Sequence, residues 1–426
     1  MLNILYILFV LIMTVTTPFC ETTGISYISL LIPFIFFGKR EYILSFILYA
    51  SIIFYRVPPG IPIMPLLIIG YAISLIVNER IQRLGYEVNV KKLSLFILSI
   101  AFLTYSCYSS ITGSYDSLFK TIVFIALLYY ATYDKNCDIK LLQRLLVFAS
   151  VCGLIFWAFK ISLMPDISME GRRSISMLHN PNVVARGASL MIIIVFFARQ
   201  FWDSTLPKIL LDICIICGFL TIFFTGSRMG IMATIITMIL CMYWGSSNKE
   251  SRFIKIAFVG IILLVLGNIA LNLLNIDIGR YATGFTSEII EGDARLASSQ
   301  VLWTHAISQH PIKGVGLGGD NSLYFLEYVP DADNLIIDIL TQLGIIGLCT
   351  IVILLIKSLK AIKANIKNRR IQFKHLVLPL GILISQICFS LTETVFDELT
   401  LWYALAITYI YINSILYGAS RIYRCS

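Results

Sequence analysis

The chain has 426 residues, of which 58% are hydrophobic and only 13% are charged. Soluble domains carry about 25% charged residues, so this composition excludes a soluble enzyme or binding module and indicates a polytopic membrane protein. The net charge of +9 does not indicate a nucleic-acid partner, because the basic residues gather in short loops between apolar segments. The ten scattered cysteines predict neither a disulfide framework nor a zinc site.

Hydropathy predicts an all-α fold of about 12–14 transmembrane helices in a single membrane domain, residues 1–426. A helix needs about 20 apolar residues to cross a bilayer. The first segment lacks a basic start and a small-residue cleavage site, so we expect a retained helix rather than a signal peptide. Prolines between residues 58 and 65 allow a broken helix there, and the number of spans in residues 1–77 stays open. The predicted spans are 2–19, 25–37, 42–55, 61–77, 93–109, 118–133, 145–164, 183–198, 208–225, 229–244, 254–274, 334–356, 375–391 and 399–417.

Lysine and arginine concentrate in the loops of one face of this predicted bundle, around residues 80–92, 135–144, 249–255 and 357–374. The positive-inside rule predicts that these loops and both termini are cytoplasmic. Two longer loops then lie on the outer face, a smaller one at 165–182 and a large one at 275–333. The large loop holds eight acidic against three basic residues, a net charge of −5.

The few cations predicted on the outer face are mostly arginines. The planar guanidinium can bind two phosphate oxygens at once, so this bias indicates a diphosphate ligand. Arginines near helix ends also reach lipid headgroups, which is the alternative explanation. The outer-face arginines are Arg56, Arg172, Arg173, Arg186, Arg228, Arg280 and Arg295.

The large loop contains a predicted helix, residues 294–310, that Asp293 can cap and Pro311 ends. An α-helical spacing would align four side chains on one face of this helix, Leu296, Gln300, Trp303 and Ile307. Arg295 lies in the first turn, where the helix dipole disfavours a cation, so we expect an anionic partner. That partner is either a ligand or a nearby carboxylate of the same loop.

Glycines follow this helix at positions 314, 316 and 319. The spacing matches a dinucleotide-binding pattern, but no strand precedes it and no helix begins after it, so we reject that function. A turn that brings the backbone close to a substrate or another helix is the better interpretation of Gly314 and Gly316. His305 and His310 lack the spacing of a metal-ligand set, so no metal site is predicted.

Two further polar motifs lie at the predicted outer ends of spans. Gly171, Arg172 and Arg173 precede the sequence His179, Asn180, Pro181 and Asn182, and Arg186 follows one turn into the next span. An arginine at that depth is costly unless it faces a polar cavity. Thr225, Gly226, Ser227 and Arg228 join two spans. Arg228 binds either an anion or backbone carbonyls at this junction.

These motifs, in this order and on one membrane face, resemble those of the O-antigen ligase and polymerase superfamily of bacterial membrane glycosyltransferases. The resemblance covers residues 171–347 and rests on GRR with HNPN, TGSR, RLASSQVLW and PIKGVGLG. It implies a GT-C-like architecture with a large periplasmic loop in the bacterial inner membrane. It also implies undecaprenyl-diphosphate-linked glycans as substrates, no metal or other cofactor, and a chain-length regulator and a flippase as further partners.

The ligases of this family carry a histidine, then Asn, Ser or Gln, nine residues, a glycine, two residues, and Gly, Thr or Tyr. The chain has Asn334, Gly344 and Gly347 at these spacings, but Asp333 stands at the histidine position. This departure favours a polymerase, which passes a growing glycan to the terminal sugar of another lipid-linked repeat. The alternatives are a ligase that transfers polymer to lipid A core and, from another class, a polysaccharide flippase. A transporter would carry its charges near mid-membrane, often with repeat symmetry.

Our mechanistic hypothesis assigns roles to individual residues. Arg228 and Arg295, followed by Arg172 and Arg173, are expected to bind the diphosphate, and Asp333 is the candidate general base. The alternative role of Asp333 is to cap the helix that begins near Leu335. Arg186 and Arg280 are further diphosphate candidates. The residues expected to shape the loop or contact glycan are His179, Asn180, Trp303, Gly314, Gly316 and Asn334.

Overall fold

A computed structural model describes residues 2–16, 31–53 except 37, 63–81, 115–162 except 133, 135 and 136, 181–245 except 202–205 and 226, 300–316, 334–367, 377–390 and 399–424. Every regular element in these ranges is a helix, so the predicted all-α fold is confirmed. The predicted spans 93–109 and 254–274 lie outside the described residues.

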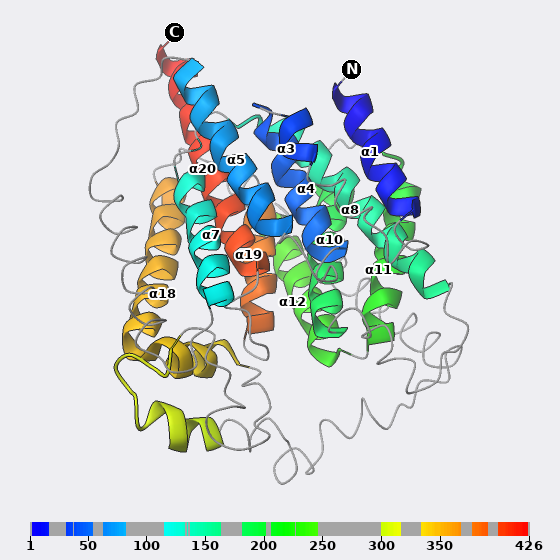
Figure 1. Ribbon diagram of the computed structural model, residues 1–426. Coiled ribbons are helices and arrows are strands. Elements are labelled where there is room, and N and C mark those ends of the chain that lie inside the picture. The colour runs from blue at the N-terminus through cyan, green and yellow to red at the C-terminus, as the bar shows by residue number, and fades with distance from the viewer. Residues whose placement is uncertain are drawn as a thin grey trace.

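Most of the helices run roughly along one common direction (Figure 1). Both chain termini lie at one end of the bundle, called here the terminus end, and α10 and α12 begin at the opposite end, called the motif end. The helices are α1 (Leu2–Thr16), α3 (Ile32–Ile35), α4 (Arg40–Ile53), α5 (Ile63–Ile81), α7 (Tyr115–Ala131), α8 (Ile139–Ser162), α10 (Pro181–Phe201), α11 (Lys208–Thr225), α12 (Arg228–Gly245), the π-helix η5 (Trp303–Ile307), α18 (Leu335–Lys367), α19 (Val377–Ser390) and α20 (Leu399–Arg424).

Four of these helices are long and apolar enough to cross a membrane, within the part of the chain that the structure describes. Their apolar segments are Ile139–Lys160, Asn182–Gln200, Lys208–Thr225 and Leu335–Ile353. Shorter apolar helices surround them, and the bundle is that of a polytopic membrane protein. Of the predicted span 25–37, the described part contains only the short helix α3.

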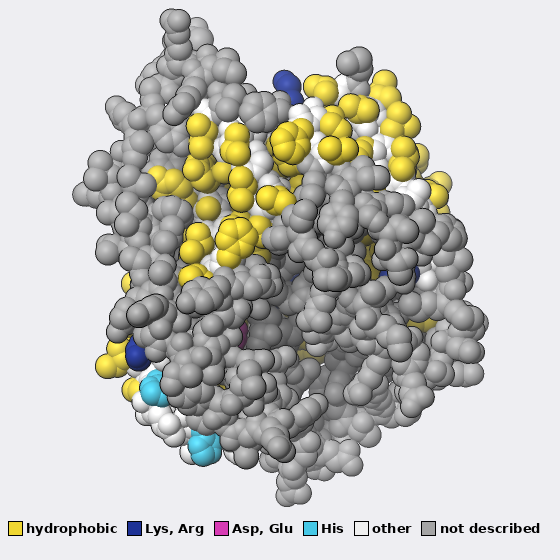
Figure 2. All heavy atoms as spheres, in the orientation of Figure 1, with side chains coloured by type: hydrophobic (Ala, Val, Ile, Leu, Met, Phe, Trp, Pro, Cys, Tyr) yellow, Lys and Arg dark blue, Asp and Glu magenta, His cyan; other side chains and the backbone are white. Residues whose placement is uncertain are grey.

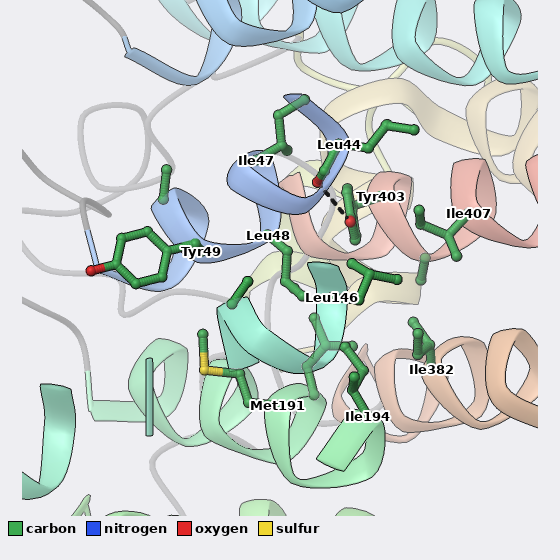
Figure 3. Close-up of a cluster of buried hydrophobic side chains, with 14 of the residues drawn as sticks. Leu44, Ile47, Leu48, Tyr49, Leu146, Met191, Ile194, Ile382, Tyr403 and Ile407 are labelled. Atoms are coloured by element: carbon green, nitrogen blue, oxygen red, sulfur yellow. Dashed lines mark hydrogen bonds between the residues drawn. The ribbon is translucent and has the colours of Figure 1, made fainter. Parts of the chain in front are cut away.

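Helix α10 is the centre of the bundle, because 89% of its apolar segment is buried against 33% for α18. It packs against α4, α8, α11, α12 and α19. Figure 3 shows Met191 and Ile194 of α10 beside Leu146 of α8 and Ile382 of α19. The hydroxyl of Tyr403 donates to the carbonyl of Leu44 at 2.8 Å and ties α20 to α4 (Figure 3). Helix α18 is peripheral, because most of its apolar segment is exposed.

A buried ionic cluster joins α4, α5 and the α7–α8 connection. Arg40 lies 3.1 Å from the carboxylate of Asp134, which also accepts a hydrogen bond from the Tyr71 hydroxyl at 3.0 Å. The Glu41 carboxylate accepts from the backbone N–H of Asp138 at 3.0 Å. Both Arg40 and Asp134 are buried. Breaking such a pair leaves one charge uncompensated, which is far more destabilising than losing an exposed pair.

We predict that Asp134→Ala lowers the stability of the folded protein by about 3–5 kcal/mol, because Arg40 loses its buried counter-charge. Thermal unfolding of the purified protein in detergent measures the change. The matched control is Asp212→Ala, which removes an exposed partner of Arg199 at 2.9 Å and should cost at most about 1 kcal/mol. Equal stability of both variants would contradict the assignment of Arg40 and Asp134 as a structural pair.

Candidate functional site

A seam of buried polar side chains runs between α10, α12 and α19. Ser189 Oγ lies 3.1 Å from Ser385 Oγ and 2.8 Å from Thr234 Oγ1, and Thr234 also bonds the Gly230 carbonyl at 2.6 Å. Hydroxyl hydrogen bonds thus connect α12 through α10 to α19, with Thr234 Oγ1 as the donor to Ser189 Oγ. Gln386, next to Ser385, is also fully buried. We call Arg186, Ser189, Thr234, Thr237, Ser385 and Gln386 the polar seam.

Arg186 occupies the second turn of α10, three residues before Ser189, and its side chain is fully buried. A guanidinium inside a membrane bundle is expensive unless its surroundings are polar or anionic. Arg186, a candidate diphosphate-binding residue, thus lies in the interior of the bundle and not on its outer surface. The headgroup explanation offered by the sequence therefore does not apply to Arg186.

The junction from Thr225 to Arg228 is a tight turn between α11 and α12. Ser227 caps α12, since its Oγ accepts from the backbone N–H of Gly230 at 3.2 Å. Thr225 Oγ1 accepts from the N–H of Ser227 at 3.3 Å. A side chain at Gly230 would have its Cβ only 3.0 Å from the Cβ of Ala185. The first turn of α12 therefore touches α10 at the residue beside Arg186, and Arg228 begins α12 at the same level.

Residues 300–316 of the large loop pack against α18. Residue Ser308 bonds the Trp303 carbonyl five positions back at 3.0 Å, which makes η5 a π-helix. Leu302 and Ile307 are buried, whereas Gln300 and Trp303 are exposed. The predicted common face of residues 300, 303 and 307 is wrong, because Gln300 and Trp303 face outward while Ile307 is buried.

The segment after η5 docks into a break in α18. Backbone hydrogen bonds join Ile345 N–H to Pro311 O at 2.9 Å and Val315 N–H to Thr341 O at 2.7 Å. At Gly344 the chain has φ = +62°, and a Cβ there would lie 2.3 Å from the Ile312 carbonyl oxygen. Only glycine fits this position. The predicted span 334–356 is accordingly not one continuous helix.

Gly314 makes the reciprocal close approach. Its φ is +71°, and a Cβ there would lie 2.4 Å from the carbonyl carbon of Gln342. Gly316, with φ = +118°, donates its N–H to the Gln342 carbonyl at 3.0 Å. The predicted close approach between this glycine turn and another helix is observed, and its partner is α18. We call the contact between residues 311–316 and 341–346 the glycine lock.

Asn334 is the N-cap of α18, because its Oδ1 accepts from the N–H groups of Ile336 at 2.9 Å and Ile337 at 3.4 Å. The capping role considered for Asp333 thus belongs to its neighbour. Gly347 follows the break, and a Cβ on it would lie 2.2 Å from the Cβ of Leu343. Asn334 caps the first part of α18, residues 335–343, which we call the half-helix, and Gly344 breaks the helix. Gly347 lies in the turn after the break.

Asp338 is a candidate that the sequence analysis missed. It lies on the half-helix, is only 3% exposed, and accepts a hydrogen bond from Gln342 Nε2 at 2.6 Å. Leu335 and Ile339, three residues before and one after, are buried on the same side. A carboxylate within an apolar predicted span was the available signal, because ionisable groups at such depth usually have a function.

Several predicted site residues lie outside the described part of the chain, and the side chain of Arg228 does as well. The predicted meeting of Arg228 with Arg295 therefore stays a prediction. Among the described residues, no group of three or more His, Cys, Asp or Glu could hold a metal ion. The residues outside are Arg172, Arg173, His179, Asn180, Arg280, Arg295 and Asp333.

The fold and these features define a helical integral membrane protein with a polar seam and a broken helix. Residues 213–352 match the family model described as O-antigen ligase. The match spans about a third of the chain and includes the α11–α12 junction, η5, the glycine lock and the half-helix. It supports membership of the O-antigen ligase and polymerase superfamily. No curated protein and no solved structure matched the chain.

We predict that Gly344→Ala destabilises the protein, because it forces an L-residue to positive φ, at about 1–2 kcal/mol, and drives a methyl group against the Ile312 carbonyl. Thermal unfolding in detergent, with limited proteolysis of the large loop, measures the effect. Ile346→Ala, two residues away at a 41% exposed position, is the control and should unfold close to wild type. An unchanged Gly344→Ala transition would show that the lock is not required.

Proposed function

We propose that the chain is an O-antigen polymerase, a glycosyltransferase that extends a surface polysaccharide. A growing glycan on undecaprenyl diphosphate is passed to the terminal sugar of another undecaprenyl-diphosphate-linked repeat. One observation supports this choice within the superfamily. The cap at Asn334 and the break at Gly344 that frame the ligase pattern are both present, but the residue before the cap is Asp333 rather than histidine.

The leaving group of this reaction is a diphosphate that gains negative charge as its bond to the sugar breaks. Arginines aligned with that charge stabilise the transition state more than the ground state. Arg186 is buried in α10. Arg228 begins α12 close to the point where Gly230 touches Ala185, the neighbour of Arg186. This arrangement supports the proposal that both arginines bind the diphosphate. The N-terminus of α12 adds the positive end of a helix dipole at the same position. We assign Arg295, Arg172, Arg173 and Arg280 to the same ligand.

The acceptor is a sugar hydroxyl, which attacks the anomeric carbon of the donor. Asp333 takes the hydroxyl proton as the new glycosidic bond forms and the bond to the diphosphate oxygen breaks. The capped half-helix begins one residue later, so Asp333 is attached directly to a rigid element. His179 and Asn180 are assigned to the glycan. In this proposal the arginines stabilise the negative charge of the leaving diphosphate, and no metal ion is required.

We further propose that the motif end faces the periplasm and that the terminus end, with its basic loops, is cytoplasmic. The protein then works in the bacterial inner membrane on substrates delivered by a flippase, together with a chain-length regulator. The polar motifs at the motif end are consistent with a reaction at the periplasmic face. The positive-inside rule supports this orientation, because the basic loops are then cytoplasmic.

A ligase is the second candidate, because the matching family model is described by that activity. A deletion strain separates the two. Lipid A core carrying single repeats indicates a polymerase, since ligation continues without extension. Core without any repeat indicates a ligase. The first pattern is the expected one.

We predict that Arg228→Ala abolishes chain extension while protein level in the membrane stays normal, because loss of one charge-stabilising donor costs about 10²–10³ in rate. The polysaccharide banding pattern of a complemented deletion strain is the readout. Arg228→Lys should retain part of the activity. Arg199→Ala, which removes an arginine paired with Asp212, is the control and should complement fully. Normal polymer from Arg228→Ala would overturn the assignment.

Replacing Asp333 tests the acceptor side separately. Asp333→Asn keeps size and polarity but cannot take a proton, so extension should fall by about 10²–10⁴, the usual contribution of a general base. Asn334→Ala removes only the cap of α18 and should mainly lower thermal stability, by about 1 kcal/mol. Full activity of Asp333→Asn would exclude Asp333 as the base.

A further inference from the structure

Two buried polar side chains near the motif end have no hydrogen-bond partner among the described residues. Gln386 of α19 is fully buried with both amide atoms unbonded, and Thr400 of α20 is 5% exposed with its hydroxyl unbonded. Such groups are costly in a protein interior, and an apolar residue of the same size would cost less. Buried polar groups are usually bonded to protein, water or a ligand. A bound molecule that supplies the missing partners would account for both residues.

Helices α10 and α19 pack against each other in an antiparallel register. Ser189 Oγ lies 3.1 Å from Ser385 Oγ, and a Cβ on Gly381 would lie 3.4 Å from Ile193 Cγ2. Four residues forward along α10 therefore correspond to four residues back along α19. In this register, position 386 of α19 is level with position 188 of α10.

Gln386 and Arg186 thus lie in the same layer of the bundle. Arg186 is two residues from position 188, a difference of about 3 Å along the helix axis. It precedes Ile193 by seven residues, or two helical turns, so it lies on the side of α10 that faces α19. Gln386 follows Ile382 by one turn, and Figure 3 shows Ile382 beside Ile194 in the core. Both polar side chains are therefore buried between α10 and α19.

Thr400 reaches the same layer from α20. Helix α20 ends at the terminus end and so runs opposite to α19 (Figure 1). Thr408 Oγ1 donates to the Pro379 carbonyl at 3.3 Å, so Thr400, eight residues earlier, is level with position 387. The Tyr403 hydroxyl bonds Leu44 of α4. On the helix, Thr400 points between the directions of Thr408 and Tyr403, into the interior that α4 and α19 border.

The three side chains that share this layer, Arg186, Gln386 and Thr400, are called here the donor cluster. A guanidinium, an amide NH2 and a hydroxyl all donate hydrogen bonds. Helices α10, α12 and α20 begin at the motif end, so the positive ends of their dipoles lie on the same side. An anion with several acceptor oxygens matches this set of donors.

The donor cluster lies close to the motif end of the bundle. Arg186 is in the second turn of α10 and Thr400 in the first turn of α20. On the face shown in Figure 2, hydrophobic side chains cover the described surface toward the terminus end, and histidine and basic side chains lie at the motif end. A ligand with a charged head and an apolar tail would therefore present its head to the cluster from the motif end.

We propose that the donor cluster binds phosphate oxygens of the lipid-linked diphosphate, with Gln386 and Thr400 as binding residues beside Arg186. The inference rests on the proposed function, because it takes that substrate as the ligand. The diphosphate oxygens accept from the Gln386 amide and the Thr400 hydroxyl. Binding thus offsets the cost of burying both groups.

The test is isothermal titration calorimetry of the full chain in detergent with farnesyl diphosphate, a short isoprenyl diphosphate. Gln386→Met and Thr400→Val keep the side-chain size and remove the hydrogen bonds. Each should weaken binding by about tenfold or more, the usual effect of losing a hydrogen bond to an ionised group. The thermal transition of the unliganded variants should be unchanged or higher, because an unpaired polar group is removed. Ser74→Ala, which removes another buried and unbonded hydroxyl from α5, is the control and should bind as wild type.

Phosphatidylglycerol, which carries a single phosphodiester, should not compete with farnesyl diphosphate. Wild-type affinity in either folded variant would overturn the proposal, as would equal competition by phosphatidylglycerol. If Gln386→Met does not fold, Thr400→Val decides. Failure of the proposed function is seen separately. Diphosphate binding that depends on the donor cluster, without any chain extension by the wild-type protein, would contradict the polymerase and leave the binding site in place.

Discussion

The backbone contact between the large loop and α18 is the constraint on which the motif end depends. Gly344 at φ = +62° and Gly314 at φ = +71° bring two main chains closer than any side chain allows. The break leaves backbone groups of α18 without helical partners, and the loop supplies partners through the Pro311 carbonyl, which accepts from Ile345, and the Val315 N–H, which donates to Thr341. Irregular backbone near a membrane is tolerated only when its polar groups are satisfied in this way. The lock therefore turns a loop motif and a helix into one structural unit.

The second element of the site is the close packing of α10 with α12. Gly230 leaves room for Ala185, and the hydroxyls of Ser189 and Thr234 bond deeper in the same seam. This packing holds the buried Arg186 at the level where α12 begins. Two arginine-bearing helices thus share one end of the bundle, while the half-helix carries the buried Asp338. In the proposed reaction, donor and acceptor chemistry come from separate rigid elements, which suits a transfer between two lipid-linked substrates.

The sequence predicted the helical membrane fold well, because apolar runs of crossing length are read directly from composition. It also predicted that the glycines after η5 bring two backbones together. It did not predict the break at Gly344, since an isolated glycine in an apolar run is compatible with a continuous helix. The contact that requires glycine at this position is made by Ile312, which is 32 positions away in the sequence. The sequence assigned Asn334 to the loop. Its capping role was not predicted, because that role depends on the residue at which α18 begins. Asp338 escaped notice because burial on one helical face depends on tertiary packing.

In the proposed function, the chain extends a lipid-linked glycan rather than attaching it to lipid A core. The most direct measurement is reconstitution of the purified protein with a single substrate, an undecaprenyl-diphosphate-linked repeat unit, followed by size analysis of the products. A polymerase should yield a ladder of longer lipid-linked glycans and release undecaprenyl diphosphate without any other acceptor. Products that form only when lipid A core is added, with no ladder from the repeat alone, would contradict it.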